Sequence, residues 1–175
     1  MSNVRVIVKP LSRHFIRYFT NHIRKTFKLK SPYFPIVEFI EMYASIDDDF
    51  NYEIVPVEKL NEYALTIPTE KLIKIREDVY IDAVNGIPRH RYTLAHELGH
   101  VFLHTPERIL LARAPSPNDI PYAERPEWQA NTFAGELLAP ADMVNTFYDE
   151  AAIAETFGVS LAVARIQLNE AKKAS

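Results

Sequence analysis

The sequence predicts an α+β fold, in which a small, mostly antiparallel sheet packs on a helix that carries the pattern H-E-x-x-H, with further helices toward the C-terminus. Two observations predict this fold. Apolar residues recur with helical spacing before residue 45 and after residue 88, whereas short runs of β-branched and aromatic residues occupy positions 51–82. At 175 residues the chain is long enough for one domain with a hydrophobic core.

The N-terminal part is expected to be helical. Ser12 can cap a helix that extends to about Phe27, where apolar residues recur at helical spacing. A second helix is expected from Pro35 to about Ala44, because proline is favourable at a first helical position. The period then changes, and we expect short strands at residues 52–57, 63–67, 72–75 and 79–82.

The remainder of the chain is expected to contain mostly helices. One helix should run from near Pro88 to about His104, and residues 105–123 should form a loop with one short turn at the edge of a cleft. Further helices are expected at residues 124–138, 141–148, 149–157 and 161–172. We therefore expect one domain over residues 1–175, with a basic helical extension at 1–31 and a helical C-terminal part at 141–175.

The expected helix at 88–104 carries His96, Glu97 and His100. Residues four apart on a helix lie roughly 40° apart around its axis, so both imidazoles can bind one metal ion. Glu97 can then reach a water molecule on that metal and act as a general base, with zinc as the expected cofactor. The chain has no cysteine, so any metal must be held by His, Asp, Glu or water.

A catalytic zinc needs a third protein ligand and one open position. The candidates are Glu124, Glu127 and Glu136 on the next expected helix. Glu127 is preferred and Glu124 is the second choice, whereas Glu136 lies on the face opposite to Glu127.

Several neighbours of these residues are candidates for supporting roles. Asn131, one turn after Glu127, can form a hydrogen bond with a metal ligand. Ala130 and Ala134 flank that face, so this helix can approach the motif helix closely, and Gly99 inside the motif helix allows a second helix or a strand to come close. A second group of candidates comprises His104, as a support for a ligand or a wall of the cleft, and Tyr92 and Tyr122, as alternative donors to an oxyanion.

Charge is uneven along the chain. The net charge is −3, yet the first 30 residues contain eight Lys and Arg and no Asp or Glu. A solvated helix face is the preferred interpretation, so we expect no direct contact with nucleic acid, and a basic surface for an acidic partner or nucleic acid is the alternative. No apolar run approaches the ~18 residues of a membrane span, and a secretory signal is lacking, so we expect a cytoplasmic protein without membrane contact.

Two segments carry a family resemblance. RYTLAHELGHVFLH at 91–104 and EWQANTFAGELLAP at 127–140 resemble the ImmA/IrrE family of metallopeptidases, and the tail at 154–168 is also similar, so that the likeness covers residues 32–170. Ala139 stands where the family usually has Met. The resemblance implies a zincin-like fold, zinc on His96, His100 and Glu127, and Glu97 as base and proton shuttle.

The resemblance also implies a substrate class. We expect a zinc-dependent endopeptidase that cleaves a helix-turn-helix repressor on a separate chain, in a stress-response or mobile-element switch. An extended substrate is expected to pair with the strand at 79–82. The alternative is a catalytically silent binding module that sequesters a regulator, or binds nucleic acid through its basic N-terminus.

Overall fold

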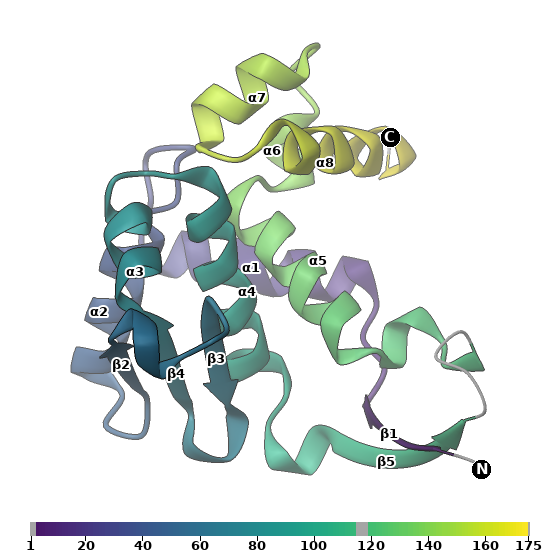
Figure 1. The fold of residues 1–175 in the computed structure, drawn as a ribbon. Helices are drawn as coiled ribbons and strands as arrows, with labels where there is room; N and C mark the ends of the chain where they lie inside the picture. Colours follow the sequence, from purple (N-terminus) through teal and green to yellow (C-terminus); the bar gives the residue numbers. More distant parts are fainter. Residues whose placement is uncertain (1–2, 115–118, 175) are drawn as a thin grey trace.

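The computed structural model describes residues 3–114 and 119–174 and has an α+β architecture (Figure 1). Its helices are α1 (Arg13–Thr26), α2 (Ile36–Ile46), α3 (Glu77–Val84), α4 (Pro88–Leu103), α5 (Pro126–Leu138), α6 (Ala141–Val144), α7 (Glu150–Phe157) and α8 (Leu161–Ala174). Its strands are β1 (Asn3–Val8), β2 (Asn51–Val55), β3 (Ala64–Ile67), β4 (Leu72–Arg76) and β5 (Ile109–Ala114). Short 3-10 turns occupy Val57–Lys59, Pro68–Glu70, Pro106–Arg108 and Tyr122–Glu124.

The strands form two separate sheets. A three-stranded sheet has the order β2-β4-β3, in which β2 is parallel and β3 antiparallel to β4. β1 and β5 form an antiparallel pair of their own, which we call the β1–β5 ribbon. Two of the three strand pairings in the described residues are antiparallel, so the predicted fold class, with a small and mostly antiparallel sheet content, is confirmed.

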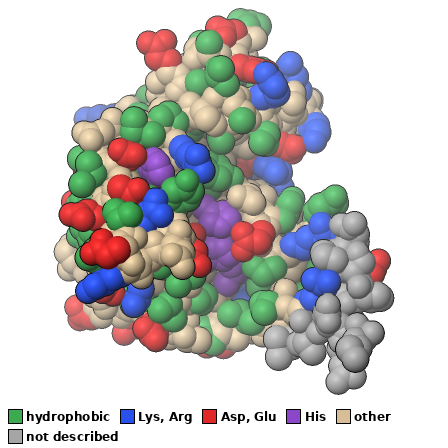
Figure 2. All heavy atoms as spheres, viewed as in Figure 1, with side chains coloured by type: hydrophobic (Ala, Val, Ile, Leu, Met, Phe, Trp, Pro, Cys, Tyr) green, Lys and Arg blue, Asp and Glu red, His purple; other side chains and the backbone are tan. Residues whose placement is uncertain are grey.

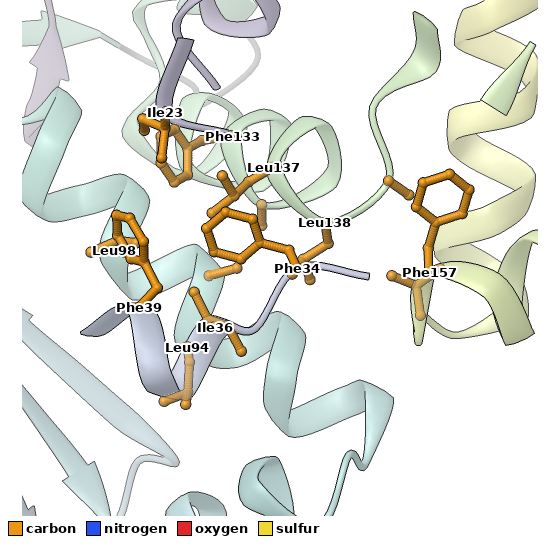
Figure 3. Close-up of a cluster of buried hydrophobic side chains, with 14 of the residues drawn as sticks. Ile23, Phe34, Ile36, Phe39, Leu94, Leu98, Phe133, Leu137, Leu138 and Phe157 are labelled. Atoms are coloured by element: carbon orange, nitrogen blue, oxygen red, sulfur yellow. The ribbon is translucent and has the colours of Figure 1, made fainter. Parts of the chain in front are cut away.

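The motif helix α4 is the centre of the molecule. It begins at Pro88 and ends at Leu103, with His104 as its C-terminal cap, as predicted. β3 lies along one side of α4, and α5 crosses its other side (Figure 1). All helices from α1 to α8 contribute residues to the hydrophobic core around α4. Figure 3 shows Leu94 and Leu98 of α4 near Phe34 and Phe39 in this core.

The close approach of α4 and α5 depends on Gly99. A methyl group at this position would lie 3.1 Å from Phe133 Cδ1 and 3.2 Å from Ala130 Cα, which is closer than ordinary van der Waals contact. The prediction that small residues bring these helices together is therefore confirmed for Gly99 and Ala130. This contact sets the distance between the motif on α4 and the first turn of α5.

The prediction of a strand at residues 79–82 is wrong, because these residues lie in α3. Short runs such as Val-Tyr-Ile-Asp are compatible with a strand or a helix. Here Val79 and Ala83, which are four residues apart, are both buried, so the segment has helical spacing toward the core. Glu77 and Asp78 occupy the first turn, where the helix dipole favours acids. This segment therefore offers no strand edge for a substrate.

The predicted loop at 105–123 is wrong in part. It contains two 3-10 turns and β5, while residues 115–118 lie outside the described part of the chain. β5 pairs with β1, so the N-terminal extension contains a strand before its helix. The partners are about 100 residues apart in sequence, which is why local patterns did not predict the pair. The predicted helix at 141–148 is also shorter and ends at Val144.

The other predicted helices are confirmed within one or two residues at most ends. Ser12 caps α1 by accepting a hydrogen bond from the Phe15 amide, and Gly158 ends α7 with a φ of 62°. Within residues 3–114 and 119–174, no single helix is long and apolar enough to cross a membrane; the bent pair α7 and α8 satisfies that test only when both helices are counted together.

Three bases of the N-terminal helix face inward rather than toward solvent. Arg13 and Arg17 bind the fully buried carboxylate of Glu136 at 3.2 and 3.1 Å. Arg24 is buried and donates to the carbonyl oxygens of Leu137, Ser31 and Pro32. The interpretation of α1 as a solvated basic face is therefore wrong for these three residues.

Candidate metal centre

α4 places the two motif histidines one turn apart on the same side of the helix. His96 Nε2 lies 3.0 Å from His100 Nε2, and both side chains are partly buried. Glu97, the next residue, is also partly exposed. Figure 2 shows a column of histidine side chains in a hollow between the part of the molecule with β2–β4 and the part with α5.

Glu127, in the first turn of α5, lies across the cleft from α4. Its carboxylate oxygens are 3.3 Å from His96 Nε2 and 3.4 Å from His100 Nε2. One ligand atom from each of the three residues lies within 4.8 Å of the others. Glu124, the alternative candidate, is in the preceding 3-10 turn and does not join this group of described residues. Glu136 faces the other way, toward α1.

The electrostatics of the group suit a cation. The hydrogen bond with His96 lowers the pKa of Glu127, which keeps its carboxylate charged. Burial, together with the nearby His96, lowers the pKa of His100 and keeps this imidazole neutral. Burial opposes the charged form of His96, but the hydrogen bond with Glu127 and the carboxylates of Glu97 and Glu127 outweigh it, so its pKa is raised. A bound cation would take the place of that proton.

A hydrogen bond behind His96 determines which of its nitrogens faces the cleft. His96 Nδ1 is 3.0 Å from Asn131 Oδ1, and the Tyr92 hydroxyl lies 3.1 Å from the same oxygen. Because an amide oxygen only accepts hydrogen bonds, Nδ1 carries a proton, so the neutral ring, once the proton shared with Glu127 is lost, has its lone pair on Nε2. The expected contact between Asn131 and a histidine of the motif is present.

A longer chain of hydrogen bonds has the same effect on His100. The amide nitrogen of the fully buried Gln129 donates to the carbonyl oxygens of Lys9 at 2.9 Å and Ala123 at 2.6 Å, so its oxygen faces His104 Nε2 at 3.3 Å. His104 Nε2 must then donate, which leaves its Nδ1 to accept from His100 Nδ1 at 2.8 Å. The Nε2 lone pair of His100 therefore also faces the cleft.

When neither Nε2 is protonated, the lone pairs of His96 and His100 and the carboxylate of Glu127 repel one another. A cation among these three groups removes that repulsion. Two imidazole nitrogens and one carboxylate oxygen are a usual ligand set of catalytic zinc sites. The residues present therefore fit a divalent metal ion of this type. The peptidase family model described as the IrrE N-terminal-like domain matches residues 48–169, well over half of the chain.

The chain belongs to this family. The resemblance stated from the sequence is thereby confirmed, and a metal is what a metallopeptidase family implies. His96, Glu97, His100 and Glu127 all lie within the matched residues, whereas β1, α1 and α2 lie before them. None of the curated proteins compared with the chain matches it.

Glu97 has a partner that the sequence did not predict. The Thr66 hydroxyl on β3 donates to Glu97 Oε2 at 2.7 Å and lies 3.0 Å from the Glu97 carbonyl oxygen. This contact ties β3, at the edge of the three-stranded sheet, to the motif helix. Thr66 is 31 residues away from Glu97 and lies in an ordinary strand pattern, so no local signal pointed to it.

The remaining candidates differ in their positions. His104 is 2% exposed and supports His100, in agreement with one of its two expected roles. Burial, followed by the neighbouring His100, lowers the pKa of His104 to about 4. The Tyr92 hydroxyl is bound to Asn131, and burial raises the pKa of Tyr92 to about 12. Tyr122 is 65% exposed beneath Arg125, and the oxyanion role of either tyrosine stays a prediction.

Proposed function

We propose that this protein is a cytoplasmic, zinc-dependent endopeptidase that cleaves a separate helix-turn-helix repressor in a stress-response or mobile-element switch. The observation that carries the proposal is the convergence of His96, His100 and Glu127 beside Glu97, in a chain that belongs to a peptidase family. His96, His100 and Glu127 would hold the metal. When bound, zinc would supply Lewis acidity and a water molecule of lowered pKa.

Glu97 is the proposed general base. Its Oε2 is engaged by the Thr66 hydroxyl, so Oε1 is the oxygen available to take a proton from the attacking water. The same carboxyl group can then deliver this proton to the amine that leaves. Thr66 thus orients Glu97 without itself taking part in proton transfer, and its link to β3 places the base beside the strand that would bind substrate.

The edge of β3 is the proposed site for an extended substrate, in place of the segment 79–82. β4 pairs with one side of β3, and no strand in the described residues pairs with the other. The Arg76 amide donates to the Tyr63 carbonyl, which makes residues 63, 65 and 67 the hydrogen-bonded positions toward β4. The backbone groups of Ala64 and Thr66 therefore point to the free edge, where a peptide can add as a strand.

The basic composition of the N-terminus suggests a nucleic-acid-binding module. The structure gives this alternative less support, because several of these bases already have partners within the protein. Arg13, Arg17 and Arg24 are occupied by Glu136 and by backbone carbonyl oxygens. We therefore propose no second function for this segment.

Cleavage of a repressor by wild type and by Glu97→Gln tests the proposal. The purified zinc-loaded chain is incubated with helix-turn-helix repressors encoded near its gene, and intact mass spectrometry identifies the products. We expect wild type to cut one repressor at one bond and Glu97→Gln to lose at least about 100-fold in rate. Equal cleavage rates in both proteins would show that Glu97 is not the general base. A stable complex that stays uncut by the zinc-loaded wild type would favour the silent binding module.

Zinc content tests the proposed ligands. His96→Ala and Glu127→Ala should each lose stoichiometric zinc, measured by elemental analysis after dialysis, because removal of one of three protein ligands weakens a site of this kind. Glu124→Ala serves as the matched control and should keep its zinc. Full zinc content in Glu127→Ala, together with loss of zinc in Glu124→Ala, would identify Glu124 as the third ligand instead of Glu127.

A further inference from the structure

A cavity of about 250 Å³ opens directly beside the candidate metal centre. One side of it is formed by His100, His104 and Glu127. The rest of its wall is apolar and comes from five residues on the β1–β5 ribbon and at the ends of β3 and α5, namely Val6, Val8, Pro68, Ile109 and Pro126.

The ribbon presents one of its two faces to this cavity. Side chains alternate along a strand, so Val6 and Val8 lie on the same face of β1. Ile109 is opposite Val8 on β5 and shares that face. Ile7 and its partner Leu110 lie on the reverse face, and Leu110 is 45% exposed. The ribbon is therefore a wall of the cavity, with an apolar side toward the metal ligands.

β1 lies outside the residues that the family model matches. Val6 and Val8 thus add to the site a surface that the matched family region does not contain. Val8 is 1% exposed and fixes the ribbon in place, whereas Val6 is 53% exposed and available for contact with a bound molecule.

We propose that this cavity is a specificity pocket, which receives an apolar side chain of the substrate residue next to the bond that is cut. The inference rests on the proposed peptidase function. An apolar cavity of about 150 Å³ is large enough to hold a benzene ring, so the space here accommodates Leu, Ile, Met or Phe. Glu127 is the one charged residue among the lining residues, and it is a proposed metal ligand. A charged substrate side chain would therefore lose its hydration without gaining a partner.

A peptide library tests the preference. Zinc-loaded wild type is incubated with synthetic decapeptides randomised at their central positions, and mass spectrometry locates the cut bonds. We expect Leu, Ile, Met or Phe to exceed charged residues by about tenfold or more at one position that flanks the cut bond. Cleavage without an apolar preference at either flanking position would overturn the proposal.

Variants of the exposed wall residue show whether the ribbon causes the preference. Val6→Asp should lower the apolar preference by about tenfold, and Val6→Phe, which narrows the cavity, should shift the preference toward Ala and Val. Leu110→Asp, on the reverse face of the same ribbon, is the matched control and should leave the preference unchanged. Equal effects of Val6→Asp and Leu110→Asp would contradict a role for the apolar face.

A binding measurement separates the pocket from the proposed hydrolysis. N-acetyl-leucine hydroxamate and N-acetyl-glycine hydroxamate are titrated into the zinc-loaded chain by calorimetry. The leucine compound should bind about tenfold more tightly, and this advantage should decrease in Val6→Asp but not in Leu110→Asp. Such a result without any peptide cleavage would reject the peptidase proposal and retain the pocket. Equal affinities, or no binding of either compound, would reject the pocket.

Discussion

Each histidine of the candidate centre has a hydrogen-bond acceptor behind it, on the side that faces away from the other ligands. Asn131 accepts from His96, and His104 accepts from His100. Such partners select the tautomer and hold the ring in place before a metal arrives. The chain behind His100 continues through Gln129 to the carbonyl oxygen of Lys9, so the segment between β1 and α1 helps to hold a proposed ligand.

At the scale of single residues, Asn131→Ala should weaken zinc binding by about 10–100-fold. The variant removes the acceptor of the His96 Nδ1 proton, and Asn131 is exposed, so the fold should remain intact. Competition against a chromophoric chelator measures the affinity. Asn169→Ala, at an exposed position of α8, is the control. An affinity in Asn131→Ala equal to that of the control would show that His96 does not depend on this bond.

The pair α4 and α5 is the element that creates the site, since α4 contributes His96 and His100 and α5 contributes Glu127. Their spacing follows from the missing side chain at Gly99, beneath which Phe133 and Ala130 pack. Gly99 lowers the helical propensity of α4 by about 1 kcal/mol relative to Ala.

At the scale of elements, Gly99→Val should reduce the free energy of unfolding by about 1–3 kcal/mol, because a side chain here forces α5 away from α4. Zinc affinity should also fall, since Glu127 moves with α5. Urea denaturation and the chelator competition measure the two effects. Ala162→Val, at an exposed position of α8, introduces the same side chain without a buried contact and should change the stability by a few tenths of a kcal/mol.

A charge cluster around a buried carboxylate joins three helices of the molecule. Glu136 of α5 is fully buried, Arg13 and Arg17 of α1 bind it, and Arg13 also pairs with Glu170 of α8 at 3.2 Å. The hydrogen bond with Glu136 raises the pKa of Arg17 above its ordinary value. The N-terminal bases thus connect α1, α5 and α8, three elements that are far apart in the sequence.

For the whole molecule, Arg13→Ala combined with Arg17→Ala should lower the free energy of unfolding by about 3–5 kcal/mol. The double variant leaves the Glu136 carboxylate buried without a compensating cation. Chemical denaturation measures the loss. Lys25→Ala combined with Lys30→Ala removes two exposed bases from the same region and should leave the stability nearly unchanged. Similar losses in both double variants would mean that total charge, not pairing, matters.

Alkaline pH should destabilise the protein through three tyrosines. Burial raises the pKa of Tyr43 and of Tyr92 to about 12, and a hydrogen bond to Glu41, followed by burial, raises that of Tyr80 to about 12. The ordinary value is 10.0, so the folded state retains these protons longer than the unfolded state. Their contribution to stability is complete below pH 10 and is lost as the pH rises to 12. Denaturation at several pH values should show this decline, with a smaller slope in Tyr92→Phe.

The sequence by itself determined the parts of the site that depend on local spacing. His96, Glu97 and His100 lie on one helix, and the helical period alone places the two imidazoles together. Glu127 and Asn131 are likewise one turn apart on α5, so the pairing of a carboxylate with a supporting amide was predictable. The helix ends at Ser12 and Gly158 were predictable for the same reason, because capping involves only neighbouring residues.

Only the tertiary structure decided which distant segments meet. It brings Glu127, and not Glu124, beside the histidines, places Thr66 behind Glu97, and pairs β1 with β5 to form the wall of the cavity. It also converts residues 79–82 from an expected strand into part of α3 and turns Arg13 and Arg17 inward. These outcomes depend on packing and pairing between residues far apart in the sequence, which no local period can specify.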